Sequence, residues 1–280
     1  MKTNLSSQIT LTRIPLKYYR PENAFEHSVL TRLEKIPTHI YESAEEGSQA
    51  IAREIATLIR KKQAIGKPFV LALPGGRSPL SVYKELIRLH KEEQLSFQGV
   101  IIFVEFEFYP LANPASGNLA RLKEELLDHI DIDPAQVYAP EATMSKDAIL
   151  DFCRQYEEQI QAVGGIDCML LGVGSSSNVM FNAAGTSINS RTRLVLLEGG
   201  SRKEASRSFS SQEALPAGVI TMGVSTILKS RKILLLASGK SKHAVVKGLL
   251  TDTVSTELPA SLLNLHSDVV VFCDKEAYEG

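Results

Sequence analysis

The sequence predicts an α/β protein with a doubly wound, mostly parallel, Rossmann-like sheet and helices on both faces of that sheet. Short runs of apolar residues, such as 69–73 and 100–104, are typical of strands buried on both faces. Amphipathic segments alternate with these runs, as in βαβ units that bind ligands beyond the carboxyl ends of their strands. No repeat, low-complexity tract or interdomain linker interrupts the alternation.

The composition sets limits on the class of protein. A chain of 280 residues with a net charge of −1 has no global attraction to nucleic acid or to an anionic membrane, so any anion site must be local. Cys153, Cys168 and Cys273 are widely spaced in apolar surroundings, which favours reduced core thiols in a cytoplasmic protein. No histidine pattern near them indicates a metal site or a catalytic thiol. No apolar run reaches membrane-spanning length, and the polar start is unlike a signal peptide.

Two regions of the chain differ in how regularly predicted strands and helices alternate. Residues 1–38 are interrupted by Pro15, Pro21 and Pro37, and we expect an N-terminal extension that forms either a packed arm or an oligomer contact. The regular domain is predicted to cover residues 39–280.

The first half of this domain contains three predicted strands, at 39–41, 69–73 and 100–104. Ser43 is a suitable cap for a helix that extends to about Lys62, because Ile51, Ile55 and Ile59 share one helical face. The second helix follows Ser78, and further helices are predicted at about 115–129 and 146–163.

The second half repeats the alternation. Strands are predicted at 166–172, 193–197, 219–222, 232–237 and 269–273, all as parts of the same sheet. Helices are predicted after residue 222 and around 245–250.

The turn after the strand 69–73 is the strongest candidate for ligand binding. Gly75 and Gly76 allow a tight turn, Ser78 is a plausible N-cap, and Pro79 suits the first position of a helix. Free N–H groups and the positive end of the helix dipole would then converge on one point, which suits a phosphate. The alternative is an ordinary strand-to-helix turn that binds nothing.

Several motifs together make the chain from about residue 40 to 275 resemble the glucosamine-6-phosphate deaminase (isomerase) family, related more distantly to 6-phosphogluconolactonases. The resemblance implies conversion of glucosamine 6-phosphate to fructose 6-phosphate and ammonia without a metal or organic cofactor. It also implies a small-molecule partner and leaves a homo-oligomer open. The matching motifs are Leu73-Pro-Gly-Gly-Arg-Ser-Pro79, Gly164-Gly-Ile-Asp167, Leu171-Gly-Val-Gly174, Phe181-Asn182, Gly185, Ser190-Arg-Thr-Arg193, Thr221-Met-Gly-Val224, and Gly239 with Lys242.

The resemblance implies that the phosphate-binding half of the family's pocket is retained. The turn with Gly75, Gly76 and Ser78 matches the phosphate loop, and Arg207 and Lys242 match the arginine and lysine contacts. An arginine fork and a compact lysine charge suit a dianion.

The half of the pocket that performs the chemistry differs from the family pattern. Phe106 stands where the family has the Asp that moves a proton between sugar carbons, and Ser176, Asn178 and Ala183 replace the Asp, His and Glu that assist ring opening. Ser176 and Asn178 can still hydrogen-bond a sugar hydroxyl, but neither titrates near neutral pH. Since loss of a positioned acid or base costs about 10²–10⁴ in rate, standard deamination is expected to be weak or absent.

Glu107 is the tentative replacement base, because the family keeps a Glu at this position. It shares a strand face with Glu105, opposite Phe106. The alternative, which we favour, is that Glu107 is a structural carboxylate that anchors a loop.

Two other chemistries are disfavoured by the residues around Gly172–Gly174. The serines that follow have no histidine at the family position to activate a nucleophile, and this glycine pair lacks the third glycine of a dinucleotide loop. Two hypotheses remain. One is a binding module that holds a sugar phosphate, and the other is a divergent deaminase, isomerase or lactonase that uses Glu107 as base.

Overall fold

The computed structural model describes residues 36–75, 79–174, 176–206, 209, 215–251 and 253–280. Most of the predicted N-terminal extension lies outside these residues, as do three predicted phosphate contacts, Gly76, Ser78 and Arg207.

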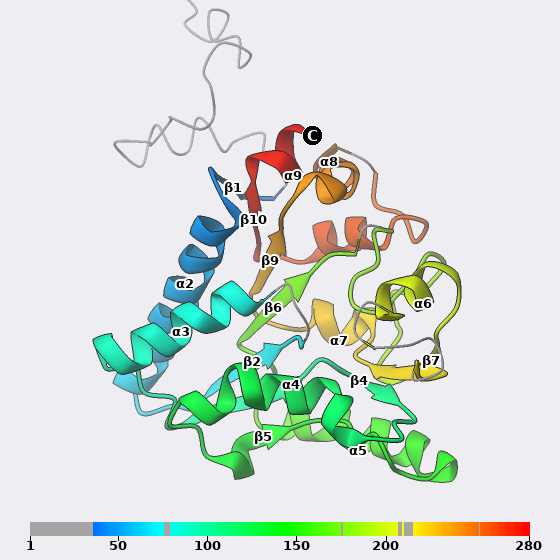
Figure 1. Ribbon diagram of the computed structural model, residues 1–280, viewed down its shortest axis with the longest axis horizontal. Coiled ribbons are helices and arrows are strands. Elements are labelled where there is room, and N and C mark those ends of the chain that lie inside the picture. The colour runs from blue at the N-terminus through cyan, green and yellow to red at the C-terminus, as the bar shows by residue number, and fades with distance from the viewer. Residues whose placement is uncertain (1–35, 76–78, 175, 207–208, 210–214, 252) are drawn as a thin grey trace, which may run out of the picture.

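A seven-stranded sheet forms the centre of the molecule (Figure 1). Every neighbouring pair of strands in it is parallel, which confirms the predicted α/β class. In spatial order the strands are β1 (Thr38–Tyr41), β10 (Val269–Asp274), β9 (Ile233–Ala237), β6 (Cys168–Gly172), β2 (Phe69–Leu73), β3 (Val100–Val104) and β5 (Val137–Tyr138).

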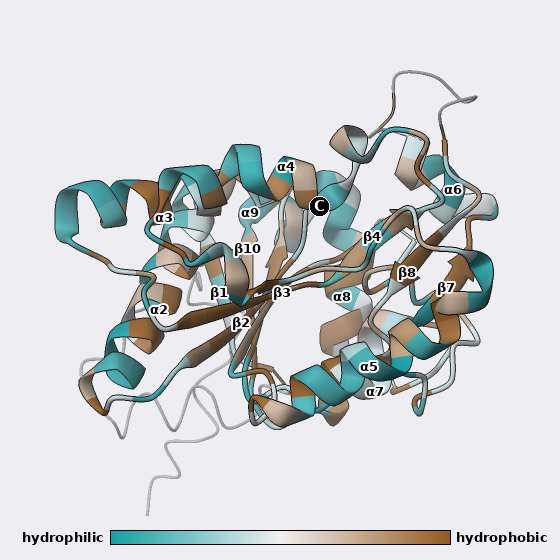
Figure 2. Ribbon diagram, turned by 90° about the horizontal axis from the view of Figure 1, so that it is seen from below, coloured by the Kyte–Doolittle hydropathy of each residue, from teal (hydrophilic) through white to brown (hydrophobic). Residues whose placement is uncertain are grey.

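Helices cover both faces of this sheet, as predicted. Side chains of three helices form one apolar layer with the strands: α2 (Ala44–Ala64), α3 (Leu80–Glu93) and α4 (Asn118–Glu125). Four helices contribute to the opposite layer: α5 (Ile149–Ala162), α7 (Val224–Leu228), α8 (His243–Thr251) and α9 (Lys275–Glu279). Figure 2 shows the brown, apolar strands between helices whose outer faces are teal.

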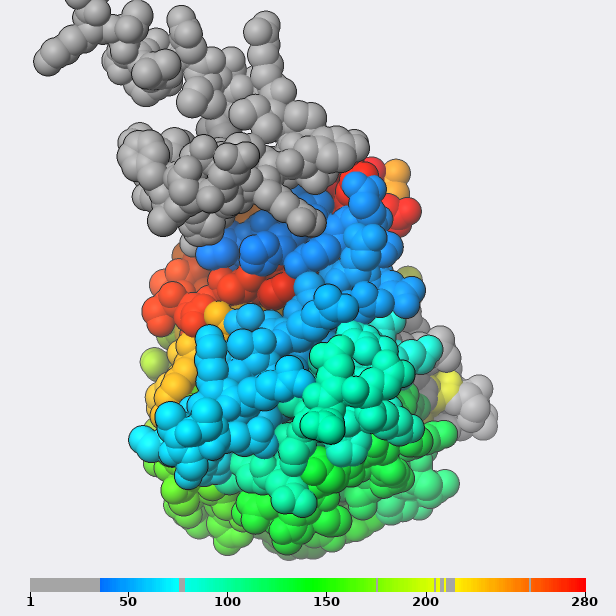
Figure 3. Space-filling model, turned by 90° about the vertical axis from the view of Figure 1, so that its left-hand side faces the viewer, coloured from blue at the N-terminus to red at the C-terminus, as the bar shows by residue number. Residues whose placement is uncertain are grey.

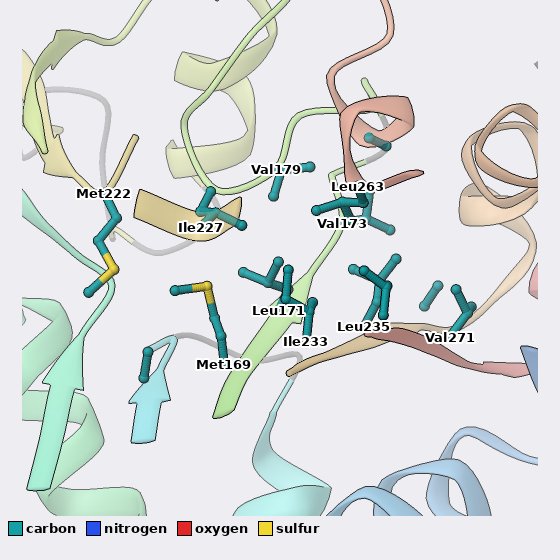
Figure 4. Packing of buried hydrophobic residues seen from close by; sticks show 14 of the residues in the cluster. Met169, Leu171, Val173, Val179, Met222, Ile227, Ile233, Leu235, Leu263 and Val271 are labelled. Carbon is teal, nitrogen blue, oxygen red and sulfur yellow. The ribbon is translucent and has the colours of Figure 1, made fainter. Parts of the chain in front are cut away.

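The strands alternate their side chains between the two layers. In β6, Met169 and Leu171 enter the layer shown in Figure 4, where they lie near Ile233 and Leu235 of β9, whereas Cys168 and Leu170 enter the other layer. Because both faces are buried, nearly every position of these strands has to be apolar.

A second, three-stranded antiparallel sheet corrects the predicted topology. It has the order β4 (Phe106–Tyr109), β8 (Gly218–Thr221), β7 (Arg193–Leu196), and α6 (Gly199–Ser206) follows β7. The sequence placed 193–197 and 219–222 in the main sheet and did not identify β4. Residue types can predict that a segment forms a strand. They do not predict which other strand it pairs with, because that pairing depends on the path of the chain between the two strands.

The chain passes from β3 of the large sheet to β4 of the small sheet through one residue, Glu105. Its N–H donates to the carbonyl of Leu73 at 3.1 Å, which extends the large sheet. Its carbonyl accepts from the N–H of Met222 at 3.0 Å, which joins the end of β8. The backbone of Glu105 therefore connects the large sheet to the small sheet.

Helix ends agree with the sequence prediction to varying degrees. The Ser43 hydroxyl accepts from the Glu46 N–H and caps α2, as predicted. Helix α3 begins at Leu80, so Pro79 immediately precedes the helix rather than starting it, and the Pro79 carbonyl accepts the first helical hydrogen bond from Tyr83. The helix predicted at 115–129 is shorter, and one-turn 3₁₀ segments flank α4.

Segments from the two ends of the described chain lie side by side. Figure 3 shows β1 and α2, in blue, against the red β10, in agreement with the pairing of Thr38 with Val271 and Tyr41 with Asp274.

Candidate ligand pocket

A pocket opens at the carboxyl ends of the parallel strands, where ligands of this fold class are expected. The residues that follow β2, β6 and β3 line it, with parts of β6 and β9. The lining consists of Pro74, Gly75, Pro79, Glu105, Phe106, Leu170, Leu171, Gly172, Val173, Gly174, Met180, Phe181 and Leu236.

Gly75 lies on the pocket wall at a position where no larger residue fits. A Cβ built on Gly75 would lie 1.7 Å from Oδ1 of Asn118, which is buried at the start of α4. The Asn118 amide donates to the Phe106 carbonyl at 2.9 Å. Asn118 is therefore hydrogen-bonded to the start of β4 and occupies the space beside the turn after β2. Tyr83 of α3 supports the same turn by donating its hydroxyl hydrogen to the Pro74 carbonyl.

Glu105 is the acidic residue of the lining, and only 1% of its surface is exposed. Its Oε1 is buried without a hydrogen-bond partner among the described residues. The nearby hydroxyls of Tyr83 and Tyr156 donate to backbone carbonyls instead. Burial raises the pKa of Glu105 well above its ordinary value, because the charged form would be desolvated and unpaired. Burial therefore favours the protonated, neutral form of Glu105.

Phe106 presents an aromatic ring to the pocket at the position where a proton-transferring Asp was expected from the resemblance. Its ring centroid lies 4.8 Å from that of Phe181, which also lines the pocket, with an interplanar angle of 70°. The same ring packs at 5.7 Å from Phe108. The pocket thus has an aromatic wall that cannot abstract a proton.

Glu107 occupies a structural position. Its two carboxylate oxygens accept hydrogen bonds from the backbone N–H groups of Phe108 at 2.8 Å, Asn118 at 2.7 Å and Leu119 at 2.8 Å. Burial raises the pKa of Glu107, while these three donors and Arg121 oppose the rise. Glu107 is absent from the described lining, so the geometry favours the anchoring role over the tentative base.

The other residues predicted to contact the sugar lie in the loop after β6. Ser176 is exposed, Asn178 is buried, and Ala183 is exposed. The carbonyl of Asn178 accepts from the Gly174 N–H at 3.0 Å, which closes the loop beside the lining residues 172–174. None of the three side chains belongs to the described lining, so sugar contacts by Ser176 and Asn178 stay a prediction.

Lys242 lies at the same edge of the sheet, in a 3₁₀ turn (Lys240–Lys242) that follows β9. Gly239 precedes this turn with a φ of +81°, a conformation that favours glycine, and its N–H donates to both carboxylate oxygens of Asp274. Because β9, β6 and β2 are adjacent, Gly75, Gly174 and Lys242 follow neighbouring strands. The predicted partners Gly76, Ser78 and Arg207 lie outside the described residues.

The described ranges contain neither a cluster of metal-binding side chains nor a membrane-spanning helix. No group of three or more His, Cys, Asp or Glu side chains is placed to hold a metal ion. No helix there has the length and apolarity needed to cross a membrane.

Of the two carboxyl groups, the sequence favours Glu107 over Glu105 as the tentative base. Alternation along one strand places both on one face, whereas the chain changes sheets between Glu105 and Phe106 and sends the two carboxyls to different environments. The signal that could have identified Glu105 is a single acidic residue directly after the apolar run 100–104, because parallel strands place their functional groups at that end.

The fold and pocket together define an α/β protein whose ligand site lies at the carboxyl edge of a parallel sheet. The sequence model for glucosamine-6-phosphate isomerases and 6-phosphogluconolactonases matches residues 42–272. The chain therefore belongs to this family.

Individual relatives agree with this assignment. The chain is 55% identical over 278 residues to a glucosamine-6-phosphate deaminase-like protein of Bacteroides thetaiotaomicron, covering 99% of this chain but only 42% of that longer protein. It is 40% identical over 234 residues to glucosamine-6-phosphate deaminase of Bacillus pumilus, covering 83% of this chain and 96% of that enzyme.

Solved structures give the same result. A monomeric glucosamine-6-phosphate deaminase matches with a TM-score of 0.81 and 37% identity, covering 86% of this chain and 98% of that one. The 6-phosphogluconolactonase of Trypanosoma brucei matches with a TM-score of 0.69 over 88% of this chain and 98% of that one. At 22% identity, the lactonase supports the fold alone.

Proposed function

We propose that this protein binds a phosphorylated sugar of the amino-sugar class in the pocket beyond β2, β6 and β9, and that standard deamination by it is weak or absent. The family, and relatives named as glucosamine-6-phosphate deaminases, support the ligand class. The glycine turn with Gly75, together with Lys242, Ser78 and Arg207, would hold the phosphate.

One observation carries the proposal of weak turnover, and it concerns the groups available for proton transfer. Phe106 lines the pocket in place of a carboxylate, while the retained Glu107 is held by three backbone N–H groups at the start of α4. Ser176, Asn178 and Ala183 offer no group that titrates near neutral pH.

Binding is tested by thermal unfolding with glucosamine 6-phosphate, fructose 6-phosphate and unphosphorylated glucosamine. A ligand that binds only the folded state stabilises it by about 2.7 kcal/mol at a hundred times its Kd, so both phosphates should raise the Tm and glucosamine should raise it much less. Arg207→Ala should reduce the shift, and Lys229→Ala, which changes an exposed cation after α7, is the matched control. Equal shifts with and without the phosphate would contradict the phosphate site.

Turnover is tested by ammonia release from glucosamine 6-phosphate. We expect a rate at least about 10²-fold below that of an active deaminase assayed in parallel, because positioned acid–base groups contribute that much or more. A comparable rate would instead support the divergent-enzyme alternative. In that case Glu107→Gln and Glu105→Gln, compared for activity per folded molecule, would identify the base.

A further inference from the structure

Glu105 differs from every other buried acidic side chain in the described ranges. Those others accept hydrogen bonds from backbone N–H groups, hydroxyls or arginine: Glu85, Glu107, Glu157, Asp167 and Asp274. Glu105 has no such bond, and its Oε1 is buried without a partner. An unsatisfied buried polar group is destabilising, so an isolated carboxyl on a pocket wall needs an explanation beyond the fold.

The surroundings of Glu105 suit a cation. No Lys, Arg or His is among the described residues that line the pocket. Two aromatic rings, Phe106 and Phe181, line the same pocket, and aromatic faces attract cations through their quadrupole. An ammonium group would supply the partner that a buried Glu105 carboxylate lacks, and the aromatic rings of the same lining would attract it further.

The described titratable groups that act on Glu105 or on the nearby Tyr83 and Tyr156 carry no positive charge. Tyr83 of α3 and Tyr156 of α5 lie close enough that a charge on Glu105 raises their pKa further, after burial has already raised it. Glu125 of α4 acts on Tyr83 in the same direction. These three neighbours, from three different helices, are neutral or acidic, and none can balance an ionised Glu105.

We propose that Glu105, with the rings of Phe106 and Phe181, forms a cation subsite that selects a phosphorylated sugar bearing a free ammonium group over one bearing a hydroxyl. This inference rests on the proposed function, because the phosphate would hold the sugar in the pocket while Glu105 distinguishes an ammonium group on the sugar from a hydroxyl group. In the empty pocket, burial favours the protonated form of the Glu105 carboxyl. When the ammonium enters, the carboxyl O–H bond breaks, its proton passes to the buffer, and a carboxylate–ammonium pair forms.

The test compares glucosamine 6-phosphate with glucose 6-phosphate, which differ only in the amine, by calorimetric titration in two buffers of different ionisation enthalpy. At about pH 6.5 an amine with a pKa of about 7.7–8.0 is largely charged, and the phosphate contribution is common to both ligands. We expect the amino sugar to bind about tenfold more tightly or better and to release up to one additional proton.

Two variants and a control assign this preference to Glu105. Glu105→Gln keeps the shape of the side chain and should remove both the preference and the additional proton, with the affinity for glucose 6-phosphate unchanged within about twofold. Glu105→Leu should do the same if the glutamine variant fails to fold. Glu124→Gln removes an exposed carboxylate on α4 and should change neither quantity.

The outcomes separate this inference from the function on which it rests. Equal wild-type affinities for the two sugar phosphates, or an equal loss of both in Glu105→Gln, would overturn the cation subsite and leave sugar-phosphate binding standing. Binding of neither sugar phosphate would overturn the proposed function, and the subsite with it.

Discussion

The carboxylate of Glu107 caps the helix that begins at Asn118, with Oε1 2.7 Å from the Asn118 nitrogen. Oε2 accepts from the next N–H, that of Leu119, at 2.8 Å. The first N–H groups of a helix have no partners within the helix, and a negative charge at that end is favourable. Gly117 makes the approach possible, because a Cβ there would lie 3.0 Å from both oxygens. Glu107 thus fastens β4 to α4.

The first prediction is that Glu107→Gln destabilises the protein by about 2–3 kcal/mol. Hydrogen bonds to a charged acceptor contribute about 1.5–3 kcal/mol each, and glutamine keeps one acceptor oxygen but turns an NH₂ group toward backbone donors. Urea unfolding monitored by circular dichroism measures the loss, with the exposed Glu124→Gln expected within about 0.5 kcal/mol of wild type. A fully stable variant would show that the cap is dispensable.

The second prediction concerns the pH dependence of stability that Glu105 imposes. Burial raises the folded-state pKa of Glu105 above its ordinary value of 4.5, so the folded protein retains this proton to a higher pH than the unfolded chain. Between the two pKa values the folded state binds more protons, and the free energy of unfolding therefore falls as pH rises. Glu105 alone should contribute a decrease of up to about 1.4 kcal/mol per pH unit above about pH 4.5.

Glu105→Gln or Glu105→Leu should remove this contribution. The stability advantage of either variant over wild type should grow as the pH is raised from about 5 to about 8. Urea unfolding at several pH values measures the difference. Parallel curves for wild type and variant would contradict a raised pKa for Glu105, and the Glu124→Gln curve should follow wild type.

The third prediction is that Gly75 and Asn118 are energetically coupled. Gly75→Ala should cost about 1–3 kcal/mol, because its Cβ would overlap the Asn118 side chain. Asn118→Ala removes that obstacle together with the hydrogen bond to the Phe106 carbonyl. The double variant should therefore be more stable than the sum of the single effects, by about 1 kcal/mol or more.

The matched control for this cycle is Gly200→Ala in α6. A Cβ there would lie 3.7 Å from the nearest atoms, which belong to Ser176 and are in ordinary contact. We expect a change within about 0.5 kcal/mol. Strict additivity of Gly75→Ala and Asn118→Ala would show that the turn moves freely away from α4.

The fourth prediction is that the three cysteines are inert in the folded protein. All three are buried free thiols. Burial raises the pKa of Cys153 to about 11 and that of Cys273 to about 12, and it raises the pKa of Cys168 as well. Since the thiolate is the nucleophile, a chromogenic disulfide reagent at about pH 8 should label them only as the protein unfolds. Rapid labelling of the native protein would contradict this, and full labelling in urea is the control.

The elements with the strongest local signals could be predicted to the residue. Phe69–Leu73 and Val100–Val104 are strands with the bounds that the sequence indicated, because five consecutive apolar residues between turn signals fit only a strand buried on both faces. The Ser43 cap was predictable for a similar reason, since it depends on residues within one turn. The position of the pocket followed from the parallel sheet itself.

The small antiparallel sheet and the roles of the two glutamates could not be predicted in this way. Alternation assigns Glu105 and Glu107 to one face only while they stay in one strand, and the chain leaves the large sheet between them. Whether it does so depends on the pairing of Phe106 with Thr221, 115 residues later, which no local pattern encodes. The sequence predicted Glu107 as the tentative base, whereas the carboxyl group of Glu107 is held at the start of α4 and Glu105 is the acidic residue of the described lining.

The backbone connection at Glu105 separates the architecture of the two sheets from the side chain that the pocket offers. Glu105 joins both sheets through its N–H and carbonyl alone, and its carboxyl group takes no part in either bond. A substitution at residue 105 can therefore change the chemical group offered to a ligand while both backbone bonds between the sheets stay available.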